Sequence, residues 1–144
     1  MLDRILAFFS AQEPEEETLS VDEAAAVLLI EVMLADFEMD SRERECVSQI
    51  LSRRLNSPQT EVDRCLSVAM ERQDQSSDLY QFVRIINETY GEQQRYDLLV
   101  DLWRVAFADG QLDKYEDHRI RRICEMLHLH HSHFIKAKSE GMNA

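Results

Sequence analysis

The sequence has few of the residues that build tight turns, since its 144 residues include only 3 glycines and 2 prolines. Small all-β proteins need many such turns, so this scarcity argues against them and favours long helices. A chain of this length buries enough surface to hold a core without a disulfide scaffold or a structural metal. We therefore expect one all-α domain.

Cysteine is also scarce, and the three cysteines do not form a recognisable framework. Their number is odd, and their spacings of 19 and 59 residues match no metal or redox motif. Each lies in an apolar helical pattern. We interpret Cys46, Cys65 and Cys124 as reduced core thiols, which are typical of a cytoplasmic protein.

Long apolar runs and basic clusters are missing as well. No run reaches the roughly 18 apolar residues of a membrane span, and residues 1–9 lack the features of a signal peptide. The chain has 28 acidic and 16 basic residues, for a formal charge of −12, and its basic residues are mostly interleaved with acids. Nucleic acid is bound through clustered Lys and Arg, so we expect no nucleic-acid partner, no membrane span and a cytoplasmic location.

The chain does contain helical periodicity from about residue 20 to residue 140. Residues 1–19 are predicted to be a short amphipathic segment and an acidic linker, and residues 20–140 a helical domain. The amphipathic start leaves peripheral membrane association open, although we favour its packing on the domain. The pattern Ser20-Val21-Asp22-Glu23 has the form of a capping box and predicts a helix start.

Two predicted helices are apolar almost all round and should lie at the centre of the domain. The first covers residues 24–35, and the second covers residues 98–108, where only Asp101 and Arg104 are charged. Gly91 is expected to end another helix with a positive φ angle. Altogether the periodicity predicts a single-domain bundle of about seven to eight helices.

An internal repeat relates the two halves of the chain. Residues 32–43 match residues 105–116 without a gap, at an offset of 73. Beyond that match, apolar positions coincide in three pairs: Val47 with Ile120, Ile50 with Ile123, and Val62 with Ile135. We predict two three-helix halves, about 24–70 and 97–140, related by a pseudo-twofold axis, with the two apolar helices packed against one another.

Each half carries the pattern Ala-Asp-x-x-x-Asp-x-x-Glu at a turn between two helices. The acids are Asp36, Asp40 and Glu43 in the first half, and Asp109, Asp113 and Glu116 in the second. One interpretation is helix capping, with an Asp at the cap and a Glu at the third helical position. Gly110 would then supply a positive φ angle in the second turn.

The other interpretation is a cation site, because Ca²⁺ and Mg²⁺ take carboxylate and carbonyl oxygens as ligands. Capping does not explain Asp36 and Asp109, which lie at the end of the preceding helix and face the negative end of its dipole. The spacing is not that of an EF-hand. Both interpretations stay open, and so does the choice between one shared ion and two separate ones.

The twin acidic turns, the preceding segments 29–32 and 102–106, and the apolar periodicity that follows resemble the TerB-like domain of the tellurite-resistance protein B family. The resemblance covers about residues 20–140 and is nearest to the stand-alone bacterial branch. It implies an all-helical bundle, a place in bacterial stress-response or membrane-associated complexes rather than in catalysis, and a divalent-cation site. By position, the implied metal ligands are Asp36, Asp40, Glu43, Asp109, Asp113 and Glu116.

The first turn departs from the family pattern, because Phe37 stands where the family usually has glycine. A bulky residue resists a positive φ angle, so the second turn, with Gly110, is the better candidate for an ion. Four histidines between residues 128 and 133 could bind Zn²⁺, but we favour a solvated turn between helices. A single Glu125–His128 pair does not make a di-iron site.

No catalytic constellation stands out in the sequence, so we expect a protein that is not an enzyme. The leading hypothesis is an interaction module of the TerB-like type with a protein partner and a weakly bound divalent cation, Ca²⁺ or Mg²⁺ before Zn²⁺. The alternative is a protein-binding adaptor whose acidic turns are only helix caps. The sequence leaves a homodimer open.

Overall fold

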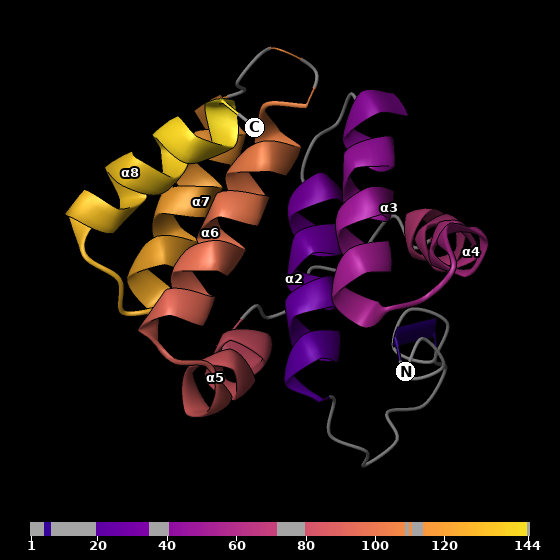
Figure 1. Cartoon of the computed structure of the whole chain (residues 1–144), viewed down its shortest axis with the longest axis horizontal. Coiled ribbons are helices and arrows are strands. Elements are labelled where there is room, and N and C mark those ends of the chain that lie inside the picture. The colour runs from indigo at the N-terminus through magenta and orange to yellow at the C-terminus, as the bar shows by residue number, and fades with distance from the viewer. Residues whose placement is uncertain are drawn as a thin grey trace.

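The computed structural model describes residues 5–6, 20–34, 41–71, 80–108, 110 and 114–143, and in these ranges it contains seven α-helices and no strand (Figure 1). The helices are α2 (Val21–Leu34), α3 (Ser41–Leu55), α4 (Gln59–Glu71), α5 (Tyr80–Thr89), α6 (Glu92–Ala106), α7 (Lys114–Met126) and α8 (His131–Met142). The prediction of an all-α bundle is confirmed. In the described ranges, none of the helices has both the length and the apolar character needed to span a membrane.

Helix α2 begins where the capping box predicts. The Ser20 backbone N–H donates to the Glu23 carboxylate at 2.8 Å, and the Glu23 backbone N–H donates to the Ser20 hydroxyl at 3.2 Å. Each side chain thereby satisfies one of the backbone donors that a helix start leaves without a partner. Glu23 is only 1% exposed, so this cap is part of the core boundary.

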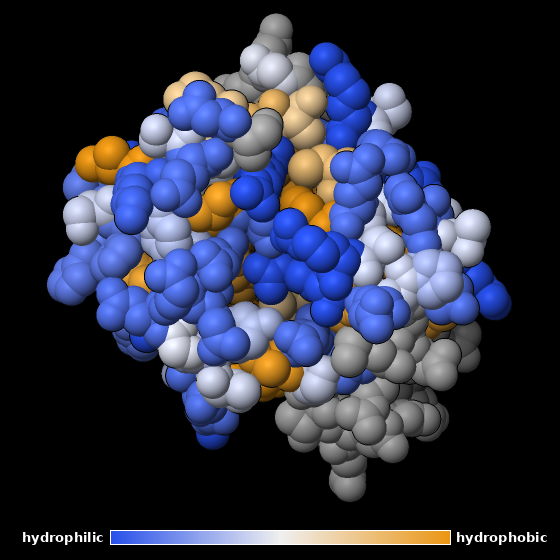
Figure 2. All heavy atoms as spheres, viewed as in Figure 1, coloured by the Kyte–Doolittle hydropathy of each residue, from blue (hydrophilic) through white to orange (hydrophobic). Residues whose placement is uncertain are grey.

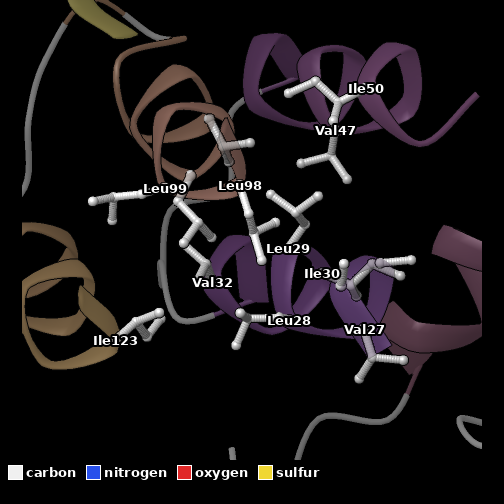
Figure 3. Packing of buried hydrophobic residues seen from close by; sticks show 14 of the residues in the cluster. Val27, Leu28, Leu29, Ile30, Val32, Val47, Ile50, Leu98, Leu99 and Ile123 are labelled. Carbon is white, nitrogen blue, oxygen red and sulfur yellow. The ribbon is translucent and has the colours of Figure 1, made fainter. Parts of the chain in front are cut away.

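Helices α2 and α6 form the centre of the bundle. Ten of the 14 residues of α2 and nine of the 15 residues of α6 are buried, and the two helices contact one another. Figure 3 shows Leu98 and Leu99 of α6 directed toward Leu29 and Val32 of α2. Helix α3 packs on both central helices, α4 packs on α3, α5 packs mainly on α2, and α7 and α8 pack on α6 (Figure 1).

Helix α8 lies very close to α6 because Gly141 has no side chain. A Cβ atom at Gly141 would overlap the Cβ atom of Trp103 and press on the α6 backbone. Trp103 is fully buried, and its ring meets the ring of Phe134 edge to face with centroids 5.2 Å apart. Lys138 places its ammonium 5.2 Å from the centroid of the same indole.

The helix starts follow the repeat closely. Shifted by 73 residues, α2, α3 and α4 would begin at residues 94, 114 and 132, while α6, α7 and α8 begin at residues 92, 114 and 131. The central helices of the two halves are in contact, as the repeat led us to expect. The pseudo-twofold relation itself, like the half boundaries and the division at residue 20, stays a prediction.

The third helix of each half departs from the expected register. Val62 of α4 is fully buried, but Ile135, its partner at an offset of 73, is 56% exposed. Helix α8 instead buries Phe134, and the left-handed residues Asn56 and His128 are 72 positions apart. The second half is therefore one residue shorter by the end of α7, and this turns the buried face of α8 by one position.

Gly91 also differs from its predicted role. Its φ of −74° and ψ of 176° are extended, and it is the N-cap of α6 rather than the left-handed end of α5. Its backbone N–H donates to the side-chain oxygen of Gln94 at 3.0 Å. Helix α5 ends at Thr89, and Tyr90 completes it with a bond from its N–H to the Ile86 carbonyl. A positive φ angle is not needed because the chain turns directly into the next helix.

Most of the predicted segment 1–19 lies outside the described residues, which include only residues 5 and 6 of it. Ile5 is 1% exposed and belongs to the core, and Leu6 packs partly against the core. This burial supports the interpretation that the amphipathic start packs on the domain.

Candidate cation site at the acidic turns

The two acidic turns belong to one end of the bundle. In Figure 1 the C-terminal ends of α2 and α6 and the N-terminal end of α3 lie at the same end of the molecule. Each turn connects a central helix to the next helix of its half. The topology thus puts the start of the first turn beside the start of the second.

Glu43 and Glu116 are the parts of the predicted site whose side chains the structure describes. Each is the third residue of its helix, α3 or α7, and they are 0% and 1% exposed. The four aspartates Asp36, Asp40, Asp109 and Asp113 lie outside the described residues. The structure therefore shows one buried carboxylate at the same place in each half, and the complete set of six ligands stays a prediction.

Gly110 has the positive φ angle that the sequence predicts for it, 81°. Its backbone N–H donates to the Phe107 carbonyl at 2.9 Å, and Ala108 donates to Val105 at 3.2 Å. These bonds satisfy carbonyls at the end of α6 and start the turn. Its counterpart at an offset of 73, Phe37, lies outside the described residues.

A carboxylate at this depth is costly to bury unless donors or a cation compensate its charge. The positive end of the helix dipole gives part of this compensation to Glu43 and Glu116, because both lie in a first turn. Glu23 is buried to the same degree at the start of α2, and there a capping box provides the donors. The environment of the two glutamates thus suits either a reciprocal cap or an oxygen ligand for a hard cation.

The donor set of the predicted site contains only carboxylates, which suits Ca²⁺ or Mg²⁺ better than Zn²⁺. Within the described part of the chain, no group of three or more His, Cys, Asp or Glu side chains is arranged to hold a metal ion. A cation at either turn would therefore need the aspartates of that turn in addition to Glu43 or Glu116.

The histidine cluster forms a turn and a helix start, as the favoured interpretation predicts. His128 has a φ of 58°, His130 is the N-cap of α8, and both are exposed. His133 accepts a bond from the His130 backbone at its Nδ1 atom, and its Nε2 atom lies 3.1 Å from Glu92. Glu125 is also exposed, so the Glu125–His128 pair does not face a bundle core.

The cysteines are free thiols rather than metal or redox groups. Cys65 and Cys124 are buried, and Cys46 is half-buried. Burial raises the pKa of the Cys65 thiol to about 11, so its reactive thiolate form is rare at neutral pH.

Asp101 is the polar feature that the sequence analysis passed over. It is 2% exposed in the middle of α6, and its carboxylate meets three guanidinium groups. Arg53 lies 3.1 Å away, Arg54 2.7 Å away and Arg104 3.0 Å away. The available sequence signal was an Asp followed three residues later by an Arg on an otherwise apolar helix. Arg53 and Arg54, however, are 48 and 47 residues distant in the chain.

The fold and the turns define the class of protein: an all-α domain with an acidic turn before α3 and another before α7. Residues 22–139, which are 118 of the 144, match the family described as tellurite resistance protein TerB. The chain therefore belongs to the TerB family, as the motifs indicated. No curated protein and no solved structure matches the chain.

Proposed function

We propose that this TerB-family domain is a non-catalytic interaction module that binds a divalent cation, Ca²⁺ or Mg²⁺, at its acidic turns. The observation that supports the proposal is the pair of buried glutamates, Glu43 and Glu116, at the same position of the repeat. Each gives one oxygen ligand on a rigid helix, beside a turn that carries two aspartates in the sequence. The aspartates would complete the coordination.

Family membership supports a role in a tellurite-resistance-like stress response, with a protein partner that the domain contacts. We place the module in the cytoplasm, and the three free thiols support a reducing compartment. In this proposal the cation fixes the geometry of the turns and so controls the surface that the partner meets. Chemistry on a substrate is not part of the role.

One observation favours the alternative, a partner-binding adaptor without a metal. Glu23 shows that this chain buries a glutamate at the start of a helix for capping alone. Glu43 and Glu116 occupy the corresponding third position of α3 and α7. On this reading the acidic turns only satisfy backbone donors, and cations leave the protein unchanged.

Asparagine substitutions separate the two functions, because Asn caps a helix as well as Asp does but brings no charge to a cation. The metal-free protein and its Asp109→Asn and Asp113→Asn variants are titrated with Ca²⁺, Mg²⁺ and Zn²⁺ in a calorimeter. Binding heat in the parent protein, lost in the variants with unchanged stability of the metal-free state, is expected. Glu88→Gln, at an exposed position of α5, is the control that keeps binding.

A thermal melt gives the second readout of the same proposal. An ion at a hundred times its dissociation constant should stabilise the parent protein by about 2.7 kcal/mol. The same shift is expected in Glu88→Gln and not in Asp113→Asn. Absence of both binding heat and a thermal shift in the parent protein would leave the adaptor as the function.

A further inference from the structure

A groove lies between α3 and the C-terminal parts of α6 and α8, and its volume is about 530 Å³. Its polar lining includes Arg53 and Arg104, and its apolar lining includes Ile50, Phe107 and Met142. Figure 2 shows strongly hydrophilic atoms gathered in the middle of this face, next to hydrophobic ones. A volume of this size is typical of sites for small molecules, roughly 300–1,000 Å³.

The wall of this groove carries excess positive charge in a protein whose formal charge is −12. One carboxylate, Asp101, meets three guanidinium groups, so the cluster has a net charge of +2. Arg53 donates through Nη2 to both Asp101 oxygens, Arg54 approaches Oδ2 through Nε and Nη2, and Arg104 donates to Oδ1. A carboxylate has about four lone-pair sites, so Asp101 is saturated. Other N–H groups of the cluster need another acceptor.

Arg53 and Arg104 are the guanidinium groups that can take a ligand. Their side chains are 60% and 35% exposed, and both line the groove. Arg54 is only 15% exposed and does not line it. The Nε atom of Arg104 is buried and has no acceptor among the described residues, which is an unfavourable state for a charged donor.

We propose that this groove binds a small organic monocarboxylate, with its carboxylate on Arg53 and Arg104 and its apolar body against Ile50, Phe107 and Met142. The guanidinium fork matches a carboxylate with two parallel bonds. The net negative charge of the protein repels a dianion such as phosphate more strongly than a monoanion. The apolar lining needs a ligand with a hydrocarbon part. None of the six acids of the turns belongs to this site, so it is independent of the proposed cation binding.

Hexanoate is the probe, and hexanamide is its neutral analogue of the same shape. Binding is followed by NMR through the backbone amides and the arginine Nε–H groups of the intact chain. Saturable shifts in the millimolar range at Gln49, Arg53 and Arg104 are expected with hexanoate. About tenfold weaker binding is expected with hexanamide and with inorganic phosphate. Equal binding of hexanamide, tighter binding of phosphate, or no shifts with hexanoate would each overturn the proposal.

Two variants assign the binding to the groove. Arg53→Gln should weaken hexanoate about fivefold or more, while Arg54 and Arg104 stay on Asp101 and preserve the fold. Arg84→Gln is the matched control, because Arg84 is an exposed arginine of α5 with one exposed partner, Glu88. Unchanged hexanoate affinity in a folded Arg53→Gln protein would place the ligand elsewhere and contradict the proposal.

Cys46 gives an independent measurement, since it lines the groove and is half-buried while the other two cysteines are buried. Hexanoate should slow the alkylation of Cys46 in the parent protein, and hexanamide at the same concentration should not. Equal protection by both compounds would argue for apolar occupancy alone and against a carboxylate site.

Discussion

Individual residues show how differently this chain treats its charges. Arg84 and Glu88 form an ion pair on α5 with exposed fractions of 70% and 64%, and such a pair adds little to stability. Asp101 is almost completely buried and depends on its three arginines. In that environment the attraction is stronger, but removing one partner leaves charges of like sign together in a low-dielectric setting. The buried cluster is therefore the most sensitive polar feature among the described residues.

We predict that Asp101→Asn lowers the free energy of unfolding by about 3–5 kcal/mol, because three guanidinium groups would then face one another without a counter-charge. Urea unfolding measures the loss. Asp97→Asn is the control on the same helix, since Asp97 is exposed and bonds only to the side chain of Gln93 among the described residues. Its effect should stay within about 0.5 kcal/mol. Equal effects of the two variants would show that the cluster does not hold α3 against α6.

At the scale of elements, local signals predicted what depends on local chemistry. Ser20 and Glu23 are three residues apart, and their capping box forms as expected. The nearly continuous apolar runs of α2 and α6 predicted their central place. The role of Gly91 was not predictable from its identity, because both a C-terminal cap and an N-cap accept glycine and only the next helix decides between them.

The register of α8 could not be predicted from the ungapped repeat. Val62 and Ile135 are both β-branched apolar residues, and nothing local distinguishes a buried one from an exposed one. The missing residue in α7 turns α8, so that Phe134, Ala137 and Gly141 face α6. Close approach at Gly141 then fixes that face, because a side chain there would overlap Trp103.

The register makes a prediction about two equivalent positions of the repeat. Val62→Ala should lower the free energy of unfolding by about 1–3 kcal/mol, since it removes fully buried methyl groups and leaves a cavity. Ile135→Ala should change it by less than about 0.5 kcal/mol, because that side chain is 56% exposed. Chemical denaturation of both variants compares them directly. A larger loss for Ile135→Ala would restore the offset of 73 for the third helix.

At the scale of the whole molecule, the formal charge of −12 is concentrated rather than spread. Residues 13–23, 36–45 and 109–117 hold 15 of the 28 acids and only three basic residues, while the remaining residues are balanced. The repeat predicted the two acidic turns, and the buried positions of Glu43 and Glu116 give these turns a fixed point in the fold. The Asp101 cluster was missed because its partners come together only in the folded chain, across α3 and α6.

The same fold should be sensitive to alkaline pH, because it buries weak acids in their neutral form. Burial, followed by the hydrogen bond to Asp22 and the charge of Asp22, raises the pKa of Tyr90 from 10.0 to about 12. The Tyr90 hydroxyl donates to Asp22 at 2.8 Å and so ties the α5–α6 connection to the start of α2. Above pH 10 the unfolded phenol loses its proton while the folded one keeps it. This contribution to stability is therefore complete below pH 10 and is lost as pH rises toward 12.

We predict that the free energy of unfolding of the parent protein falls between pH 10 and about 12, with Tyr90 responsible for on the order of 2 kcal/mol of that fall. Tyr90→Phe should lose about 1 kcal/mol at neutral pH with its hydrogen bond. Its stability should then decline less steeply than that of the parent protein across the alkaline range. Tyr80→Phe, at a position 62% exposed, controls for the loss of a phenol as such. Urea unfolding at several pH values measures the slopes, and identical slopes for Tyr90→Phe and the parent protein would show that Tyr90 does not link proton binding to folding.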